Sequence, residues 1–293
     1  MDPHLLRSFV AVVERGSFSA AAQALGYTQS AVSQHIAALE ADLGTPLLRR
    51  RPVGPTEAGE RLMEHARPLL LRLEAARADL ARLTRVRPAR LTLACAPAAL
   101  TPALADTLAG LRRAAPGLAV EVRVLGRDEA VRAVLTGAAD LALVTGAAAP
   151  SDPLPLPDAG PMTTRAAAEE PLAVLLPASH PLAGRPALRL TDLADARWID
   201  APDTAVPLAE LRAAARSDGF EAQVTYGGTD LRGLGMLVAA GHGLAALAPG
   251  VAEGLAGTVA VRVSAPRLVH RTEIVHPRDP DEPVRALVAA LTG

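Results

Sequence analysis

Apolar residues in the first sixty positions recur at the spacing of helices that bury one face. Between Gly16 and Leu48 they predict two short helices joined by a tight turn. Ser17 and Thr28 are suitable N-caps, because a hydroxyl can accept from a backbone N–H that the first helical turn leaves unpaired. Gly26 can adopt the left-handed conformation that ends the first helix. The pattern therefore predicts a helix-turn-helix, with a further helix over 3–15 before it.

The second of these helices has two unlike faces. The stripe that we expect to be buried comprises Val32, Ile36, Leu39 and Leu43. The opposite face comprises Gln29, Ser30, Ser33, Gln34 and Ala37. A helix face that meets only solvent more often carries Glu and Arg, whereas short hydroxyl and amide side chains let a helix lie close to base edges and phosphates. We therefore interpret this face as one that reads DNA.

A two-stranded wing is expected over 47–56, with Arg49, Arg50 and Arg51 at its tip. Three arginines on a loop can simply be solvated. Because they follow a reading helix, they are better placed to hold phosphates or to enter the minor groove. We favour that role for two of the three, and the sequence does not say which two.

A long helix is expected over 57–85, ended by Arg87-Pro88. Its apolar positions alternate steps of four and three: Leu62, Ala66, Leu69, Leu73, Ala76, Leu80 and Leu83. Such a seam can pack on its own domain, but seven positions exceed the face that a small domain offers, so we expect it to pair with a second copy. Pro68 removes a backbone hydrogen bond inside the helix and should bend it.

From Arg90 onward short strands alternate with helices, which predicts a mostly parallel sheet covered on both faces. The first set comprises strands over 91–95, 120–125 and 141–145 and helices over 102–114 and 128–136. A second set, after a Pro-rich loop at 150–161, comprises 171–177, 198–200, 208–216, 223–227, 231–240 and 244–249. Segments 259–263, 270–276 and 284–291 are expected to return to the first set.

Composition adds an asymmetry of charge. Residues 1–90 carry 13 Arg against 9 Asp and Glu, whereas residues 91–293 carry 17 against 22. A basic N-terminal part on an acidic remainder suits a chain that touches nucleic acid at one end. The single cysteine, Cys95, lies in the apolar run LTLAC, which favours a buried filler and a reducing cytoplasm. We expect neither a membrane span nor a signal peptide.

Catalytic and cofactor motifs are not found in the sequence. The seven histidines make no metal-binding spacing, and neither a G-x-S-x-G elbow nor a P-loop occurs. Gly241 to Ala246 fit a G-x-G-x-x-A fingerprint, but they follow an expected helix where a dinucleotide site needs a strand. We expect these glycines to end a helix, and we expect neither enzyme activity nor a cofactor.

The first sixty residues resemble the winged helix-turn-helix of the LysR-type transcriptional regulators. The matching pieces are FxAVxExGSFSxAAxxL at Phe9 to Leu25, SAVSxxIxxLExxLGxxLxxR at Ser30 to Arg49, and TEAG at Thr56 to Gly59. Two positions depart from the family's pattern. Leu48 stands where Phe is usual, and Gln34 stands where Arg is frequent, which removes one charged contact.

The resemblance implies a mainly α winged helix-turn-helix over 1–58, a linker helix over 59–88 and a two-lobed α/β effector domain of the periplasmic-binding-protein-like (type 2) fold over 89–293. Lobe I would cover 89–163 and 267–293, and lobe II 164–266, with crossovers near Thr163–Arg165 and Arg262–Arg267. HPLA at His180 to Ala183 and the run from Val238 to Pro249 match weaker motifs of the family.

Parallel α/β lobes bind ligands at the carboxyl ends of their strands and between lobes. Three loops follow strands in this way, at 96–101, 201–204 and 227–230, and they correspond to the family's effector-contacting loops. Our candidates are Ala98, Ala99, Leu100, Thr101, Arg127, Pro202, Asp203, Thr204 and Thr229. Alternatively, Thr101, Thr229 and Asp230 only cap helices, which we favour for Asp230. The Ala and Pro of the first loop argue against a carboxylate effector held there.

The interpretation is a cytoplasmic regulator that binds dyad-symmetric double-stranded DNA as a dimer, with half-sites about 34 Å apart or a multiple of that, and is modulated by a small-molecule effector. Candidate DNA contacts are Ser17, Thr28, Gln29, Ser30, Ser33, Gln34, Arg49, Arg50 and Arg51. The resemblance adds a homotetramer and contact with RNA polymerase. Two alternatives stay open: a small-molecule-binding protein or enzyme whose first helices only mediate interaction, and a constitutive regulator with a vestigial cleft.

Overall fold

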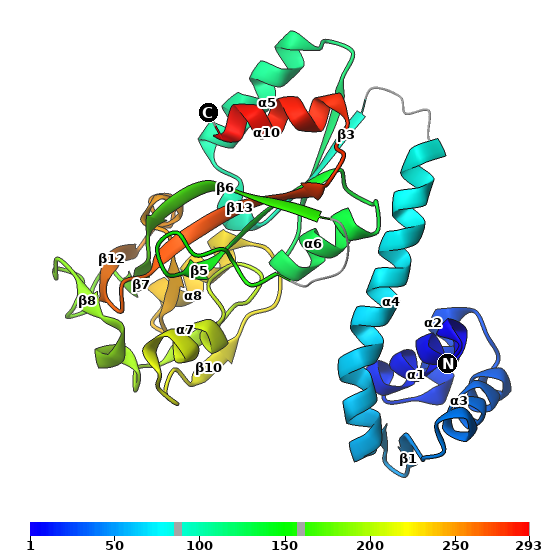
Figure 1. Ribbon diagram of the computed structural model, residues 1–293. Helices are drawn as coiled ribbons and strands as arrows, with labels where there is room; N and C mark the ends of the chain where they lie inside the picture. The colour runs from blue at the N-terminus through cyan, green and yellow to red at the C-terminus, as the bar shows by residue number, and fades with distance from the viewer. Residues whose placement is uncertain (85–89, 157–161, 293) are drawn as a thin grey trace. The chain divides into compact units, whose positions relative to one another are not determined.

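The computed structural model describes residues 1–84, 90–156 and 162–292, and the chain folds into two compact units (Figure 1). The first unit is Met1–Ala81, and the second comprises residues 82–156 and 162–292. The expected end of the linker helix at 85–88, and part of the Pro-rich loop at 157–161, lie outside the described residues.

The first unit begins with three helices whose bounds follow from their caps. Helices α1, α2 and α3 are Pro3–Arg15, Phe18–Leu25 and Gln29–Leu43. Asp2, Ser17 and Thr28 each accept a hydrogen bond from a backbone N–H of the following turn. Gly16, Gly26 and Gly44 end the helices with φ of 60°, 70° and 69°, a left-handed conformation that glycine adopts without strain. The expected helix-turn-helix is therefore observed.

The wing is a hairpin of β1 (Leu48–Arg50) and β2 (Val53–Pro55). The Glu40 carboxylate holds its base by accepting from the N–H groups of Leu47 and Leu48 at 2.8 and 3.2 Å. Leu48 is 6% exposed in the core of this unit, so leucine fills the place where Phe is usual. In the TEAG motif, a Cβ on Gly59 would lie 2.1 Å from the Leu47 carbonyl oxygen, so only glycine fits there.

Helix α4 (Glu57–Thr84) packs on this unit along only part of its apolar seam. Leu62 packs against the core and Ala66 is fully buried, whereas Leu69 is 46% and Leu80 66% exposed. The side chain of the last expected seam position, Leu83, lies outside the described part of the chain. The seam thus extends beyond the face that the unit covers.

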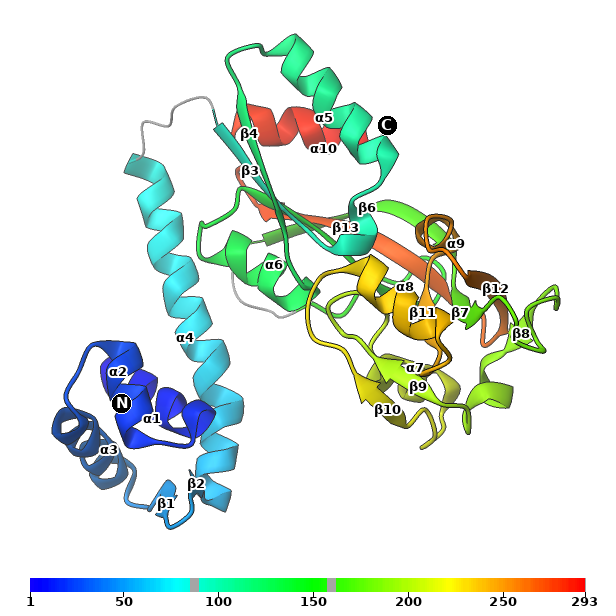
Figure 2. The same cartoon turned by 180° about the vertical axis from the view of Figure 1, so that it is seen from behind.

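In the second unit, the first lobe is a five-stranded sheet in the order β4-β3-β5-β13-β6. The strands are β3 Arg90–Cys95, β4 Ala119–Val124, β5 Leu141–Ala148, β6 Met162–Pro171 and β13 Val269–Pro277. Helices α5 (Pro102–Ala114) and α10 (Glu282–Thr292) lie on one side, with α6 (Arg127–Leu135) on the other (Figure 2). The sheet is mixed, because β13 runs antiparallel to both β5 and β6. The expectation of a mostly parallel sheet is wrong at this edge.

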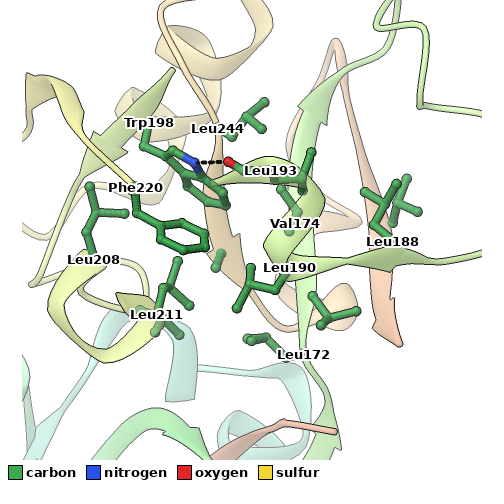
Figure 3. Packing of buried hydrophobic residues seen from close by; sticks show 14 of the residues in the cluster. Leu172, Val174, Leu188, Leu190, Leu193, Trp198, Leu208, Leu211, Phe220 and Leu244 are labelled. Carbon is green, nitrogen blue, oxygen red and sulfur yellow. Dashed lines mark hydrogen bonds between the residues drawn. The ribbon is translucent and has the colours of Figure 1, made fainter. Parts of the chain in front are cut away.

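The second lobe has a four-stranded sheet, β11-β7-β12-β8, and a parallel pair, β10-β9. Its strands are β7 Ala173–Pro177, β8 Leu188–Arg189, β9 Trp198–Asp200, β10 Ala222–Thr225, β11 Ala245–Leu247 and β12 Thr258–Ala265, and its helices are α7 Leu208–Ala215, α8 Leu231–Ala239 and α9 Pro249–Ala252. Both β11 and β12 run antiparallel to β7, so the parallel expectation is also wrong here. Trp198 and Phe220 lie in the hydrophobic core of this lobe. The Trp198 indole N–H donates to the Leu193 carbonyl at 2.9 Å (Figure 3).

The first crossover between lobes differs from the expected position. Strand β6 stays hydrogen-bonded to β13 from Met162 to Pro171, so residues 164–171 belong to the first lobe and the chain crosses after Pro171, not near Thr163–Arg165. The return comes between the end of β12 at Ala265 and the start of β13 at Val269, at the end of the expected span.

Candidate nucleic-acid interface and effector region

The free face of α3 carries the side chains expected to read DNA. Gln29, Ser30 and Gln34 are exposed and Ser33 is half-buried, while Val32, Ile36 and Leu39 on the opposite face are at most 1% exposed. Leu43, which we expected in the buried stripe, is the last residue of α3 and is 40% exposed, so that expectation is wrong. From Gln29 to Gln34 this face is thus polar and uncharged.

The two N-cap hydroxyls have structural partners. Ser17 Oγ accepts from the Ala20 N–H at 3.3 Å, and Thr28 Oγ1 accepts from the Ala31 N–H at 3.2 Å. Thr28 Oγ1 also lies 3.0 Å from Ser30 Oγ. These contacts place Ser17 and Thr28 at the starts of α2 and α3, where a helix N-terminus favours an anion such as a phosphate.

The wing arginines are exposed but not equivalent. The Arg50 guanidinium lies over the Phe18 ring, 5.8 Å from its centroid. A Cβ on Gly54 would lie 3.6 Å from an Arg49 guanidinium nitrogen, so that side chain lies along the facing strand. Arg49 is therefore oriented by the facing strand of the hairpin. Arg50 is oriented by Phe18 of α2, because a cation is attracted to an aromatic face.

In the first lobe, the loop after β3 presents little chemistry. Ala98 and Ala99 form a buried 3-10 turn at 6% and 5% exposure, whereas Leu100 is 46% exposed. Thr101 Oγ1 accepts from the Leu104 N–H at 3.3 Å and caps α5. Of this loop, only Leu100 and Thr101 have side chains that a ligand can touch.

The loops of the second lobe likewise contain both buried and accessible candidate residues. Thr204 is 3% exposed and its hydroxyl donates to the Ala201 carbonyl at 3.4 Å, while Pro202 is exposed. Thr229 is half-buried beside Asp230, whose carboxylate accepts from the N–H groups of Arg232 and Gly233. Asp230 therefore caps α8, as expected.

Two carboxylates of the second lobe reach the start of α6 in the first. A Cβ on Gly126 would lie 1.9 Å from an Asp203 carboxylate oxygen, so Asp203 lies directly against that backbone. Arg127, the first residue of α6, forms an ion pair with Glu210 of α7 at 2.5 Å. Arg127 and Asp203, both named from sequence, thus come together. Glu210 was missed, because nothing local in the sequence marks its partner.

A second buried ionic cluster was also missed. On β13, Arg271 pairs with Glu273 at 2.8 Å and with Glu169 of β6. The same Glu273 oxygen accepts from the Leu154 N–H at 3.1 Å. Arg271 and Glu273 lie two residues apart in the strand segment HRTEIVH. Two charges on one face of a buried strand are a signal that sequence reading can use.

Burial also sets the chemistry of two other groups. Cys95 is fully buried, and desolvation raises the pKa of its thiol to about 12. His270, 4% exposed on β13, has its pKa lowered to about 4 because burial disfavours the charged ring. Within residues 1–84, 90–156 and 162–292, no group of three or more potential ligands converges on a metal position. No helix in that part of the chain is long and apolar enough to cross a membrane.

A winged helix-turn-helix followed by a long helix and a two-lobed α/β unit defines a class of DNA-binding proteins with a ligand-binding module. The family model of the LysR substrate binding domain matches residues 85–293, and that of the bacterial regulatory helix-turn-helix protein, lysR family, matches residues 3–60. The chain belongs to the LysR family of transcriptional regulators.

Individual relatives agree. A probable hydrogen peroxide-inducible genes activator of Mycobacterium avium is 38% identical over 65% of this chain and 59% of its own length. A small neutral protease regulatory protein of Streptomyces coelicolor is 34% identical over 81% of this chain and 70% of its own length. Full-length BenM has the same fold, with a TM-score of 0.56, 23% identity and coverage of 99% of this chain and 95% of that one. CbnR complexed with its target DNA gives a TM-score of 0.54 at 20% identity, with 99% of each chain covered.

Proposed function

We propose that the protein binds a dyad-symmetric operator as a dimer and reads it with Gln29, Ser30, Ser33 and Gln34 of α3. Ser17, Thr28 and the wing arginines hold phosphates, with Arg49 and Arg50 the two that we assign to that role. The observation that carries this proposal is the exposed, uncharged polar face of α3 above a fully buried apolar face. Such a face approaches base edges without the desolvation of a fixed charge.

The dimer is supported by α4. Leu69 and Leu80 remain exposed on a seam whose first positions are already covered. A large apolar side chain left exposed at heptad spacing is the surface that a second helix buries. On the family resemblance alone, we further propose that the protein forms a tetramer and contacts RNA polymerase. On the same ground we propose that it acts in the cytoplasm and is not an enzyme.

The effector is proposed to bind between the lobes, near Leu100, Thr101, Arg127, Pro202, Asp203 and Thr229. Ala98, Ala99 and Thr204 are buried and would shape the site without touching the ligand. Because Arg127 is already paired with Glu210, an anionic effector would have to displace that carboxylate. A cysteine-based peroxide response is not part of this proposal, since the single thiol is buried and its pKa is raised.

Selection of bound genomic fragments by the purified protein at physiological salt tests the proposal. An enriched dyad-symmetric site is expected, and Ser33→Arg or Gln34→Ala should weaken its binding while the fold and the oligomer stay intact. Binding that is unenriched and vanishes as salt rises would contradict it.

A constitutive regulator is the second candidate, favoured by the closed Arg127–Glu210 pair. A thermal-shift panel of metabolites separates the two, because specific stabilisation by any compound rules out the constitutive version.

A further inference from the structure

We propose that Ser8 and His35 are positioning residues for DNA reading. The hydrogen bond between them fixes the rotation of α3 about its own axis, and with it the direction of Ser33 and Gln34. The inference rests on the proposed role of α3, and its test compares variants with the wild-type protein on DNA that the wild type has already selected.

The single hydroxyl proton of Ser8 decides which atom is the donor in this hydrogen bond. Ser8 Oγ, on fully buried Ser8 of α1, lies 3.1 Å from the His4 carbonyl and 2.8 Å from His35 Nδ1. The carbonyl can only accept, so the single hydroxyl proton is donated to it. The hydroxyl must then accept from His35, so the ring carries a proton on Nδ1.

The same ring also contacts the turn before α3. Tyr27 meets His35 edge to face, with ring centroids 5.2 Å apart and planes at 88°. Tyr27 directly precedes Thr28, the N-cap of α3, and its N–H donates to the Ala22 carbonyl at 2.9 Å. His35 therefore connects α3 both to α1 and to the turn that precedes α3.

The apolar contacts of α3 alone do not fix its rotation about its own axis. Val32, Ile36 and Leu39 bury the helix, but burial is non-directional and tolerates small rotations. A rotation of about 20° moves a side-chain tip at a radius of about 5–6 Å by about 2 Å, enough to break a hydrogen bond to a base. His35 follows Gln34 directly in the chain, so an anchor there acts on the reading face at close range.

Three variants of the full chain separate the hydrogen bond from general stability. Ser8→Ala removes the acceptor, His35→Phe keeps a ring against Tyr27 without a donor, and His35→Asn keeps an amide N–H in place of the Nδ1–H. Affinity for the selected site should fall about tenfold in Ser8→Ala and His35→Phe, as expected for one lost directional hydrogen bond, and should stay near wild type in His35→Asn. Affinity for an unselected fragment should not change in any variant.

The matched control is Thr107→Ala, which removes a hydroxyl that likewise donates to the carbonyl four residues earlier, on α5 of the second unit. Equal losses on selected and unselected DNA, or no loss with Ser8→Ala and His35→Phe, would overturn the inference. If Ser8→Ala does not fold, the two His35 variants decide alone. Nitrogen chemical shifts of ¹⁵N-histidine should show the wild-type His35 proton on Nδ1, and a proton on Nε2 instead would also overturn it. A wild type that selects no DNA refutes the proposed function, whereas the histidine spectrum still tests the bond.

Discussion

Arg127 of the first lobe and Glu210 of the second form an ion pair of 2.5 Å, with their side chains only 17% and 18% exposed. The second Glu210 oxygen accepts from the Ala147 N–H at 3.3 Å, so one carboxylate holds both the start of α6 and the end of β5. The pair links the two lobes directly. Opening the lobes about the crossovers would break it.

The two side chains should therefore be energetically coupled. We expect Arg127→Gln and Glu210→Gln each to lower the free energy of unfolding, and the double variant to be more stable than the sum of the two losses predicts, by about 1–3 kcal/mol. Urea unfolding of the four proteins measures the coupling. Additive losses would contradict an interlobe pair.

Gly146→Ala provides a control on the same contact. A Cβ at Gly146 would lie 2.6 Å from an Arg127 guanidinium nitrogen and 3.0 Å from a Leu154 methyl carbon. The substitution should be less harmful when Arg127 is already Gln, because the crowded atom is then absent. An equal effect in both backgrounds would place the clash elsewhere.

Cys95 should be inert in the native protein. Its thiol is buried and its pKa is raised to about 12, so almost no thiolate exists at pH 8. We expect iodoacetamide to modify it only at the rate at which the protein unfolds, as followed by intact mass. Rapid labelling of the folded protein, at the rate seen in urea, would contradict the burial of this thiol.

His270 should make the second unit sensitive to acid. Its pKa is about 4 in the folded protein and 6.5 ordinarily, so between these values the unfolded chain takes up a proton that the folded chain refuses. Stability should fall as the pH drops from 6.5 to 4, by up to about 3 kcal/mol from this group. Unfolding of wild type and His270→Leu over this range tests it. The variant should lose less stability on acidification, and parallel pH profiles would show that His270 is not responsible.

Arg50 should contribute affinity without sequence preference. Removing a phosphate contact in Arg50→Ala should weaken binding to selected and unselected DNA alike, and reduce the slope of log affinity against log salt by about 1. Arg50→Lys keeps the charge but loses the planar contact with Phe18, so we expect the wild-type slope with lower affinity. Arg185→Ala, at an exposed position of the second unit, is the control. A change in sequence preference with Arg50→Ala would mean that Arg50 reads bases.

The sequence predicts the first unit almost to the residue, because its helices begin and end with local signals. Ser17 and Thr28 cap helices through their own neighbours, and Gly16, Gly26 and Gly44 supply the left-handed ends. Strand β6 was not predicted because MTTRAAAEEP has neither an apolar alternation nor a run of β-branched residues. Its pairing with β13 is long-range.

In the candidate effector region, too, features set by local sequence could be predicted, and contacts between distant segments could not. Loops at strand ends could be predicted from the order of elements, and Asp230 from its capping position. The sequence could not predict which of their side chains face outward, because Ala98 and Thr204 are buried by packing from distant segments. The partner of Arg127 lies on α7, and only the folded chain brings Glu210 to it.

The exposed seam of α4 should hold the dimer together. Leu69→Glu combined with Leu80→Glu should convert a dimer into a monomer, because charges on both positions oppose burial against a second helix. Each unit should keep its stability, since these side chains are 46% and 66% exposed and leave the core of the first unit untouched. Light scattering and sedimentation measure the mass.

Met236→Glu is the matched control, because Met236 on α8 is 67% exposed and lies outside the seam. It should leave the dimer intact. A monomeric double variant should bind the selected operator far more weakly than the wild type, since two half-sites then no longer engage one linked protein. If the double variant stays dimeric, the dimer forms through another surface, and the two reading helices are paired by something other than α4.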